Sequence, residues 1–242
     1  MQKIGIVIPC YNEGARLDKS SFLSFARDNP AIYFIMVDDG SNDNTALLLE
    51  GLKNINPIQF ATLSFKSNRG KAEAVRQGIK QAFNWQKFDF VGFLDADLST
   101  PLMEIHTLLQ PFRTHPALQI VFGSRKKTGG NTIHRNPLRH RIGRLYAGFV
   151  TAILRLDIYD TQCGAKIIRV ELAKQIFEHP FIDRWLFDVE LFCRAQQLYP
   201  GKPLPYKEII LQEWIEKGDS RIRFVDLLRL PLRTLRIFLK YR

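Results

Sequence analysis

Residues 90–97 read FVGFLDAD, an apolar run that passes directly into two carboxylates, Asp95 and Asp97. A short continuous apolar run is typical of a strand buried on both faces of a parallel sheet. Carboxylates at the end of such a strand are costly to remove from water unless a cation neutralises them, and their oxygens are suitable ligands for Mg²⁺ or Mn²⁺. The stretch therefore predicts a buried strand that ends at a metal site. The alternative is that one of these aspartates caps the helix expected after Pro101.

The rest of the first half of the chain alternates between β-rich apolar runs and helical patterns. Strands are predicted at residues 4–8, 32–37, 59–65, 88–94 and 120–122, and helices at residues 17–26, 44–52, 71–83 and 103–112. This alternation predicts an α/β fold with a mostly parallel sheet, in which ligands bind beyond the carboxyl ends of the strands. The second half is less regular. There we expect helices around residues 141–154 and 187–198, a strand near 209–214, and a basic helix from 223 to the end.

The composition argues against several classes of protein. With 242 residues, 45% of them hydrophobic and 24% charged, the chain has a globular composition. Its three cysteines are far apart and show no zinc-binding spacing, which favours a reducing cytoplasm. No GxGxxG follows the first predicted strand and no Walker A motif is present, which argues against a dinucleotide-binding Rossmann enzyme and a P-loop NTPase. Because no apolar run reaches about 18 residues, we expect no helix that spans a membrane.

The net charge of +11 is concentrated in two segments. Residues 125–144 carry seven Lys and Arg and no acid, and residues 219–242 carry seven Lys and Arg with two Asp. The remainder of the chain is nearly neutral. Positive charge concentrated in this way permits nucleic acid, an anionic membrane or a phosphorylated substrate as a partner.

Short motifs run through nearly the whole chain. They are VIPCYNE at 7–13, VDDGS at 37–41, DADLSTP at 95–101, GSR at 123–125, DTQCGAK at 160–166, RWLFDVE at 184–190 and WIEKGDSR at 214–221. In this order the chain resembles family 2 glycosyltransferases with the GT-A fold, most closely the dolichyl-phosphate β-glucosyltransferase and polyprenyl-phosphate glycosyltransferase branch. Two positions depart from the pattern: Ala165 stands where an aromatic residue is usual, and Asp219 separates a glycine from a serine. The resemblance implies a GT-A glycosyltransferase domain at residues 1–222 and a basic amphipathic helical segment at 223–242.

The resemblance also implies a site for a nucleoside diphosphate sugar. Tyr11 offers an aromatic face to a base, and Asp39 can accept a hydrogen bond from a base N–H. Asp95 and Asp97 are assigned to Mg²⁺ or Mn²⁺, which bridges the diphosphate and neutralises charge on the leaving group. For Lys71 the alternative is simply the start of a solvated helix. The residues assigned to the nucleotide are Pro9, Tyr11, Glu13, Asp39, Lys71 and Asp95.

For the acceptor, the resemblance implies a phosphate bound by arginines. Arg125 is the first of them, followed by Arg139 and Arg141 on the same basic stretch. Guanidinium groups bind phosphate bidentately, which a hydroxyl acceptor does not require. Asp188 matches the acidic position that often serves as general base, so it and Arg125 are the candidate catalytic residues. Because a phosphate is already anionic near neutral pH, Asp188 could instead orient Arg125 or the sugar.

Two aromatic residues, Trp185 and Trp214, are candidates for the sugar and acceptor pocket, with core packing as the alternative interpretation. The resulting hypothesis is an inverting, metal-dependent transferase that moves a hexose to a polyprenyl or dolichyl phosphate. UDP-glucose is the first donor candidate and GDP-mannose the second. The alternatives are a family 2 enzyme that acts on a saccharide hydroxyl, for which Asp188 would be a general base, and a non-enzymatic nucleic-acid-binding module suggested by the charge alone.

The C-terminal segment predicts where such a protein works. Between residues 223 and 242, apolar residues recur at helical spacing with arginines between them, and Pro231 is expected to kink or split the helix. Basic amphipathic helices lie in the headgroup layer of anionic membranes. We therefore expect a peripheral protein on the cytoplasmic face of a membrane. The alternative is that the segment packs on the core of the domain.

Overall fold

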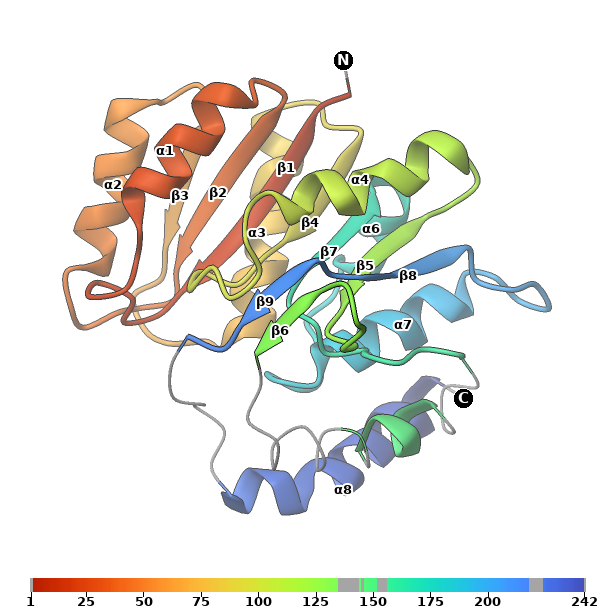
Figure 1. The fold of residues 1–242 in the computed structure, drawn as a ribbon. Coiled ribbons are helices and arrows are strands. Elements are labelled where there is room, and N and C mark those ends of the chain that lie inside the picture. Colours follow the sequence, from red (N-terminus) through yellow and green to blue (C-terminus); the bar gives the residue numbers. More distant parts are fainter. Residues whose placement is uncertain (1, 135–143, 145, 152–155, 218–223, 242) are drawn as a thin grey trace.

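The computed structural model describes residues 2–134, 144, 146–151, 156–217 and 224–241. Its centre is a seven-stranded sheet in the order β3-β2-β1-β4-β7-β5-β8 (Figure 1). The strands of this sheet are β1 (Ile4–Cys10), β2 (Ile32–Asp38), β3 (Phe60–Ser64), β4 (Phe90–Phe93), β5 (Ile120–Ser124), β7 (Lys166–Arg169) and β8 (Tyr206–Ile210). All neighbours pair in parallel except β7, which is antiparallel to both β4 and β5. The predicted α/β fold with a mostly parallel sheet is confirmed.

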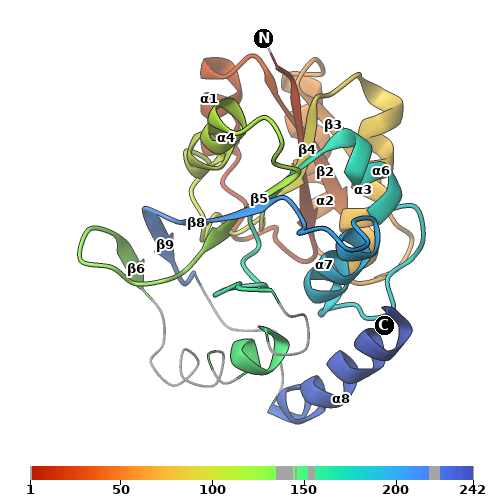
Figure 2. The ribbon, with the colours of Figure 1, turned by 90° about the vertical axis from the view of Figure 1, so that its right-hand side faces the viewer.

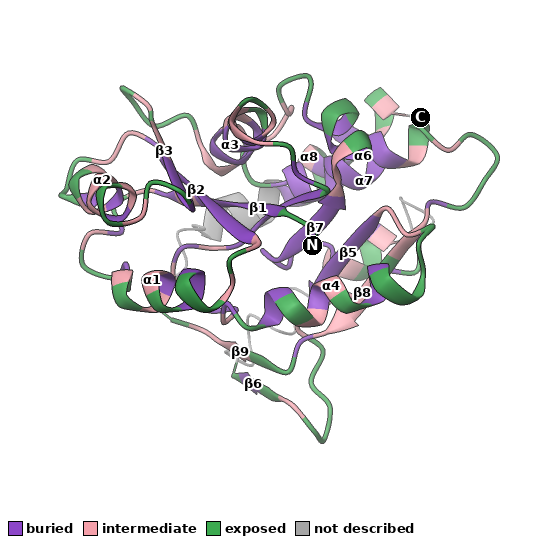
Figure 3. Cartoon of the chain, turned by 90° about the horizontal axis from the view of Figure 1, so that it is seen from above, coloured by how far each residue is buried: buried purple, intermediate pink, exposed green. Residues whose placement is uncertain are grey.

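Helices cover both faces of the sheet. They are α1 (Lys19–Asp28), α2 (Thr45–Ile55), α3 (Lys71–Trp85), α4 (Glu104–Thr114), α6 (Val170–Ile176), α7 (Phe187–Gln197) and α8 (Phe224–Tyr241). Viewed along the sheet, α1 and α4 lie on one face and α3, α6 and α7 on the other, while α2 sits beside the edge strand β3 (Figure 3). Two apolar clusters fill these layers, one on each side of almost fully buried strands. Every strand and helix predicted between residues 4 and 122 is present, which follows from their regular periodicity.

The strand β7 is the main feature that the sequence did not predict. It enters the sheet between β4 and β5 and runs against both of them. Because β4 and β5 both pair antiparallel to β7, they are parallel to each other and their carboxyl ends meet at one edge of the sheet. The first residue of β7, Lys166, lies at that same edge, opposite Phe93 and Phe122.

The strand predicted near residues 209–214 is in fact two strands. The first part belongs to β8, and the chain then changes partner to form β9 (Glu213–Ile215), which pairs in parallel with β6 (Thr132–His134) in a separate two-stranded ribbon. Backbone hydrogen bonds mark the change, with the amide of Leu211 donating to Ser124 and that of Thr132 donating to Gln212. The β6–β9 ribbon therefore closes over the carboxyl edge of β5 (Figure 2).

The C-terminal segment forms one uninterrupted helix, α8, so the expectation that Pro231 could split it is wrong. The helix packs against α7, where Tyr241 bonds with Glu190 and Arg194, and its residues Leu230, Thr234 and Ile237 are buried. Leucines on its other side are exposed: Leu232 by 71%, Leu235 by 42% and Leu239 by 63%. One face of α8 thus packs on the domain, as the alternative interpretation predicted, and a second apolar face remains at the surface. No helix in the described ranges is both long and apolar enough to cross a bilayer.

Candidate active site

The candidate site lies at the edge of the sheet where β1, β2, β4 and β5 end and β7 begins. The motifs after β1 and β2 are joined by hydrogen bonds. The backbone amide of Asp39 donates to the carbonyl of Cys10 at 2.8 Å, and the amide of Asn12 donates to Ser41 Oγ at 2.9 Å. The parallel register thus places the predicted nucleotide residues of these two loops on one rigid unit.

Asp39 is buried and already engaged. Its carboxylate accepts hydrogen bonds from the amides of Arg69 at 2.7 Å and Gly70 at 2.9 Å, and from Asn68 Nδ2 at 3.0 Å. Burial raises the pKa of Asp39 above its ordinary value, and the two amides only partly oppose this. A carboxylate has about four lone-pair positions, so three donors leave room for one more, such as a base N–H. Its assignment to the nucleoside remains a prediction.

The other nucleotide candidates on β1 differ in their exposure. Pro9 and Tyr11 are half-buried at the end of the strand, whereas Glu13 is buried and ion-paired with Arg16 at 2.9 Å. The amide of Glu13 also donates to Thr45 Oγ1 at 2.8 Å. These contacts give Glu13 a clear part in holding the loop together, and its contact with a nucleotide remains a prediction.

Asp95 and Asp97 follow β4, as predicted. The argument that their burial requires a cation does not hold. The side chain of Asp95 is 42% exposed, so desolvation is not what makes a cation necessary here. The cation that neutralises Asp95 is Lys71, the first residue of α3, whose Nζ lies 2.5 Å from Asp95 Oδ1. Burial opposes the charge on Lys71, but the carboxylates of Asp95, Asp188 and Asp97 raise its pKa above the ordinary value. Lys71 is therefore part of the carboxylate cluster and not merely the start of a solvated helix.

The helix-capping alternative for these aspartates is wrong. Asp97 Oδ1 accepts from the amide of Ser99 at 2.9 Å, whereas α4 begins at Glu104 with Met103 at its N-cap. Two carboxylates on one loop fit a hard divalent cation that takes its other ligands from water and phosphate oxygens. In the described residues no group of three or more His, Cys, Asp or Glu side chains is placed to form an all-protein metal site. The donor set thus suits a cation that binds together with a phosphorylated substrate.

Arg125 follows β5 and is held by a carboxylate that the sequence did not identify as its partner. Its Nε and Nη2 donate to Asp160 Oδ2 and Oδ1 at 2.7 and 2.8 Å, and its guanidinium lies 5.4 Å from the ring centroid of Trp214. Burial opposes the charge of Arg125, but Asp160 outweighs it and raises the pKa. Within the described part of the chain no hydrogen bond engages Nη1, so this nitrogen can donate to a ligand. Arg139 and Arg141 lie outside the described residues.

The sequence signal for Asp160 is its place at the start of the family motif at residues 160–166, but nothing in the sequence pairs it with Arg125, 35 residues away. Two further cations were also missed. Arg144 stacks 3.6 Å from the ring centroid of Tyr159 and donates to its carbonyl, and Lys126 lies 5.5 Å from the same ring. The carboxylate of Glu208 fixes this segment by accepting from the amides of Tyr159 and Asp160, both at 2.8 Å. Lys126 and Arg144 thus lie around Tyr159 and add positive charge close to Arg125 and Asp160.

Asp188 lies in the first turn of α7 and is paired with Lys166. Lys166 Nζ donates to Asp188 Oδ1 at 2.6 Å and to the Cys163 carbonyl at 2.7 Å, and both side chains are almost fully buried. The carboxylate partner of Arg125 is Asp160, so the option that Asp188 orients Arg125 is wrong. The two tryptophans differ: Trp185 is 40% exposed, and Trp214 is half-buried beside Arg125.

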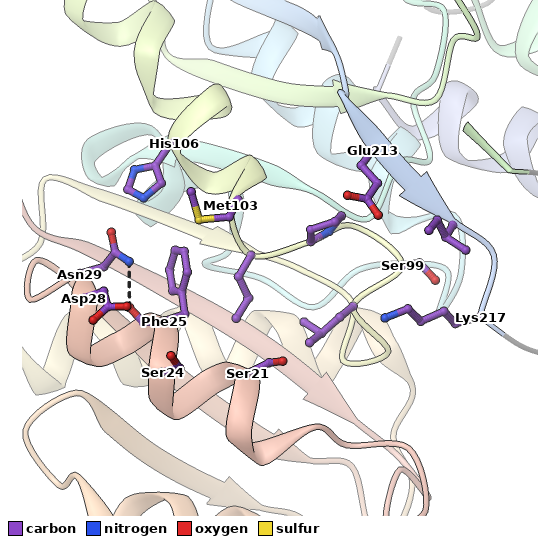
Figure 4. Close-up of a pocket in the computed structure, with 14 residues that line it drawn as sticks. Ser21, Ser24, Phe25, Asp28, Asn29, Ser99, Met103, His106, Glu213 and Lys217 are labelled. Atoms are coloured by element: carbon purple, nitrogen blue, oxygen red, sulfur yellow. Dashed lines mark hydrogen bonds between the residues drawn. The ribbon is translucent and has the colours of Figure 1, made fainter. Parts of the chain in front are cut away.

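A groove of about 730 Å³ adjoins this site (Figure 4). It runs between α1 and α4, with β9 as its third wall. It borders the carboxylate loop, defined as residues 95–99, only through Leu98 and Ser99. Phe25, Leu102 and Met103 supply apolar side chains. Among the residues that the structure describes, none of those predicted for the nucleotide, metal or acceptor lines the groove, so it is separate from the carboxylate cluster.

The mostly parallel sheet, its strand order and the helices that cover it define the GT-A fold of glycosyltransferases. Glucosyl-3-phosphoglycerate synthase from Mycobacterium tuberculosis, solved with Mn²⁺, UDP and glucosyl-3-phosphoglycerate, superposes with a TM-score of 0.72 at 18% identity, covering 99% of this chain and 80% of that one. The chain belongs to glycosyl transferase family 2, whose family model matches residues 5–177.

Several relatives that match nearly the whole chain are named dolichyl-phosphate beta-glucosyltransferase. Dolichyl-phosphate beta-glucosyltransferase ALG5C of Trichomonas vaginalis is 30% identical over 98% of this chain and 71% of its own length. The dolichyl-phosphate beta-glucosyltransferase of Saccharomyces cerevisiae is 31% identical over 90% of this chain and 69% of its own length. The branch predicted from the motifs is confirmed, and with it the assignment of the chain as a glycosyltransferase.

Proposed function

We propose that this protein transfers glucose from UDP-glucose to dolichyl phosphate or another polyprenyl phosphate, with inversion at the anomeric carbon and with Mg²⁺ or Mn²⁺. Relatives named dolichyl-phosphate beta-glucosyltransferase support both the donor sugar and the acceptor class. The mycobacterial synthase, which shares the fold, was solved with Mn²⁺ and UDP. GDP-mannose remains the second donor candidate.

On the donor side, Tyr11 and Asp39 would hold the nucleoside, and Lys71 would contact the diphosphate beside Asp95. Asp95 and Asp97 would hold the divalent cation, which neutralises the charge that develops on the departing UDP. Lys71 supports this role because its Nζ lies 2.5 Å from Asp95 Oδ1 and can move to an incoming phosphate oxygen without leaving the cluster. The leaving group would thus depart between the lysine and the carboxylate loop.

The single observation that carries the acceptor assignment is the half-buried Arg125 and its bidentate ion pair with Asp160. A guanidinium held bidentately by Asp160 and stacked on Trp214 is a rigid, permanently charged group, and Asp95 acts on it electrostatically from the donor side. Such a group suits a phosphate placed for attack on the anomeric carbon. A phosphate monoester, with its second pKa near 6, is already a nucleophile at neutral pH and needs no general base. This agrees with the ion pair that ties Asp188 to Lys166.

The surface of α8 supports a membrane-bound acceptor. Leu232, Leu235 and Leu239 lie on its exposed face, and Arg236 and Lys240 are exposed beside them. Apolar residues next to basic ones are typical of helices that lie in the headgroup layer of an anionic membrane. We therefore propose peripheral binding to the cytoplasmic face, with α8 as the contact.

A panel of nucleotide sugars tests the proposal. Purified protein would be incubated with Mn²⁺, polyprenyl phosphate and each donor in turn, and the products identified by mass. We expect a hexosyl polyprenyl phosphate from UDP-glucose. A product formed only with a free saccharide acceptor would favour the hydroxyl-acceptor alternative, and a DNA-binding module would give no turnover of any nucleotide sugar.

A further inference from the structure

Lys166, the first residue of β7, is a fully buried lysine. Its ammonium sits between the rings of Phe93 and Phe192, 5.5 and 6.0 Å from their centroids, and is paired with Asp188. Lysine is almost never fully buried unless it is paired. A buried ion pair is commonly no more stable than apolar residues of the same volume, because both charges must be removed from water. The pair therefore calls for a function besides holding the fold together.

Both groups that Lys166 holds belong to the edge of the sheet that carries the candidate site. One is Asp188 at 2.6 Å, and the other is the carbonyl of Cys163 at 2.7 Å. The next residue, Gly164, packs directly against Asp95: a Cβ placed there would lie 2.6 Å from Asp95 Cγ and 2.9 Å from its Oδ1. A single ammonium thus fixes Asp188 and the backbone wall against which the carboxylate of Asp95 rests.

The same arrangement extends to Lys71 on the open side of the cluster. Lys71 is ion-paired with Asp95, and it also interacts electrostatically with Asp188. Asp188 on α7 therefore interacts with two lysines, one from β7 and one from α3. Positive and negative groups alternate from Lys166 through Asp188 and Lys71 to Asp95, so a displacement of the first affects the position of the last.

We propose that Lys166 is a positioning residue for glycosyl transfer, which fixes the Asp188 carboxylate and the Cys163–Gly164 backbone so that Lys71 and Asp95 meet the donor diphosphate in one arrangement. This inference rests on the proposed function, since it concerns the donor side of the same site. Lys166 itself touches no substrate and acts through Asp188 and the Cys163 carbonyl.

The chain supplies a matched control on the same helix. Glu190 and Arg194 form a second buried ion pair on α7, at 2.7 Å. Arg194 donates to carbonyls between residues 176 and 180, and Tyr241 from α8 donates to Glu190 at 2.7 Å. This pair joins α7 to α8 and to residues 176–182, where the amide of Ile182 also donates to Glu190 at 2.7 Å. Its hydrogen bonds within the described residues go to these segments rather than to the carboxylate cluster. It therefore reports what the loss of a buried pair does to the fold alone.

The test compares four variants with the wild type: Lys166→Met, Asp188→Asn, the double variant with both changes, and Glu190→Gln/Arg194→Met as control. Turnover and the KM for the donor are measured per folded molecule, together with the thermal midpoint. We expect Lys166→Met to lower kcat about tenfold or more while the donor KM changes by less than about threefold. The double variant should lose less activity than the product of the two single losses, because both changes disturb the same carboxylate. The control should lose stability but keep kcat within about twofold.

Two results would overturn the inference. One is a kcat for Lys166→Met that matches the control, and the other is a loss in the double variant equal to the product of the two single losses. If Lys166→Met alone does not fold because it leaves a carboxylate buried without its cation, the neutral double variant still permits the comparison with Asp188→Asn. Absence of any product from the wild type would instead refute the proposed function. Wild-type transfer combined with either of the two results refutes the positioning role alone.

Discussion

Replacing Arg125 by alanine should have two separable effects, one on stability and one on the acceptor. The guanidinium makes two charge-assisted hydrogen bonds to Asp160, at 2.7 and 2.8 Å, and the side chains are only 17% and 9% exposed. Removing one partner of a buried ion pair costs about 3–5 kcal/mol, and the partial exposure of this pair places it near the lower value, about 3 kcal/mol. For a chain of 242 residues this corresponds to a fall in the thermal midpoint of about 6–12 °C.

The effect on the acceptor should come from the loss of the hydrogen bond that Nη1 is placed to make. A hydrogen bond between charged groups contributes about 2 kcal/mol, so kcat/KM for polyprenyl phosphate should fall about thirtyfold, whereas the affinity for the nucleotide should hardly change. Arg125→Lys should recover only part of this loss, because one ammonium cannot reproduce two bonds to Asp160 and a third to a phosphate.

The double variant Arg125→Ala/Asp160→Asn separates the two effects. It removes both charges, so it should regain much of the lost stability but none of the acceptor kinetics. Lys127→Ala is the matched control, because it removes one positive charge from an exposed position on the same loop. It should change the free energy of unfolding by less than about 0.5 kcal/mol and kcat/KM for the acceptor by less than about twofold. The reasoning is refuted if Arg125→Ala loses less than about 1 kcal/mol, or if donor affinity collapses while acceptor kinetics are unchanged.

Three further predictions concern other parts of the molecule. Asp97→Asn should cut transfer at least about a hundredfold, and full activity of the wild type in excess EDTA would contradict the metal assignment. Burial raises the pKa of Cys163 from 9.0 to about 12, so the native thiol should resist iodoacetamide at pH 8 and react once the protein is unfolded, as followed by mass spectrometry. The thiol of Cys163 ionises at a lower pH in the unfolded chain than in the folded protein. The stability that this difference contributes is present below pH 9 and is lost as the pH rises from 9 towards 12, which urea denaturation across that range would detect. Replacing Leu232, Leu235 and Leu239 together by serine should abolish flotation with anionic vesicles without unfolding the domain, since these side chains are exposed; flotation that equals the wild type would count against α8 as the membrane contact.

The elements of the first half could be predicted because each depends on a local pattern. Strand and helix periodicities there are regular, and the motifs fall at strand ends, so the sequence alone is enough to place Asp39, Asp95 and Arg125 on one edge of the sheet. Asp95 and Asp97 lie at the strand end as predicted, but the burial argument was wrong, since the side chain of Asp95 is 42% exposed and Lys71 neutralises it. Their assignment to a metal stays a prediction. What could not be predicted was the partner of each charge. Asp160 lies 35 residues from Arg125, and Lys166 lies 22 residues from Asp188.

The strand β7 was missed for a related reason. It has four residues and begins with a lysine, so it lacks both the length and the apolar character by which buried strands are predicted. Its position depends on pairing with β4 and β5, and its charge is tolerated only because Asp188 arrives from α7. The helix α8 was predicted, but Pro231 was expected to kink it or split it in two. The helix is not split at Pro231, and the burial of Leu230 and Ile237 on either side of the proline stabilises it despite the lost backbone hydrogen bond.

The charges of the site explain why a divalent cation and an anionic donor would bind together. The carboxylates of the cluster are those of Asp95, Asp97, Asp160 and Asp188, and its cations are those of Lys71, Arg125 and Lys166. The two most buried cations are each bound to a carboxylate of their own, so they contribute little net field at the open edge. What remains there is one lysine with two carboxylates, a net negative charge that repels a diphosphate. A divalent cation held by Asp95 and Asp97 would reverse that sign and make the edge attractive to the donor. The guanidinium of Arg125, proposed to bind the acceptor, would stay charged whether or not the cation is bound. Donor and acceptor phosphates would thus be held by different cations. This would let the two anionic substrates lie close enough for the acceptor phosphate to attack the anomeric carbon.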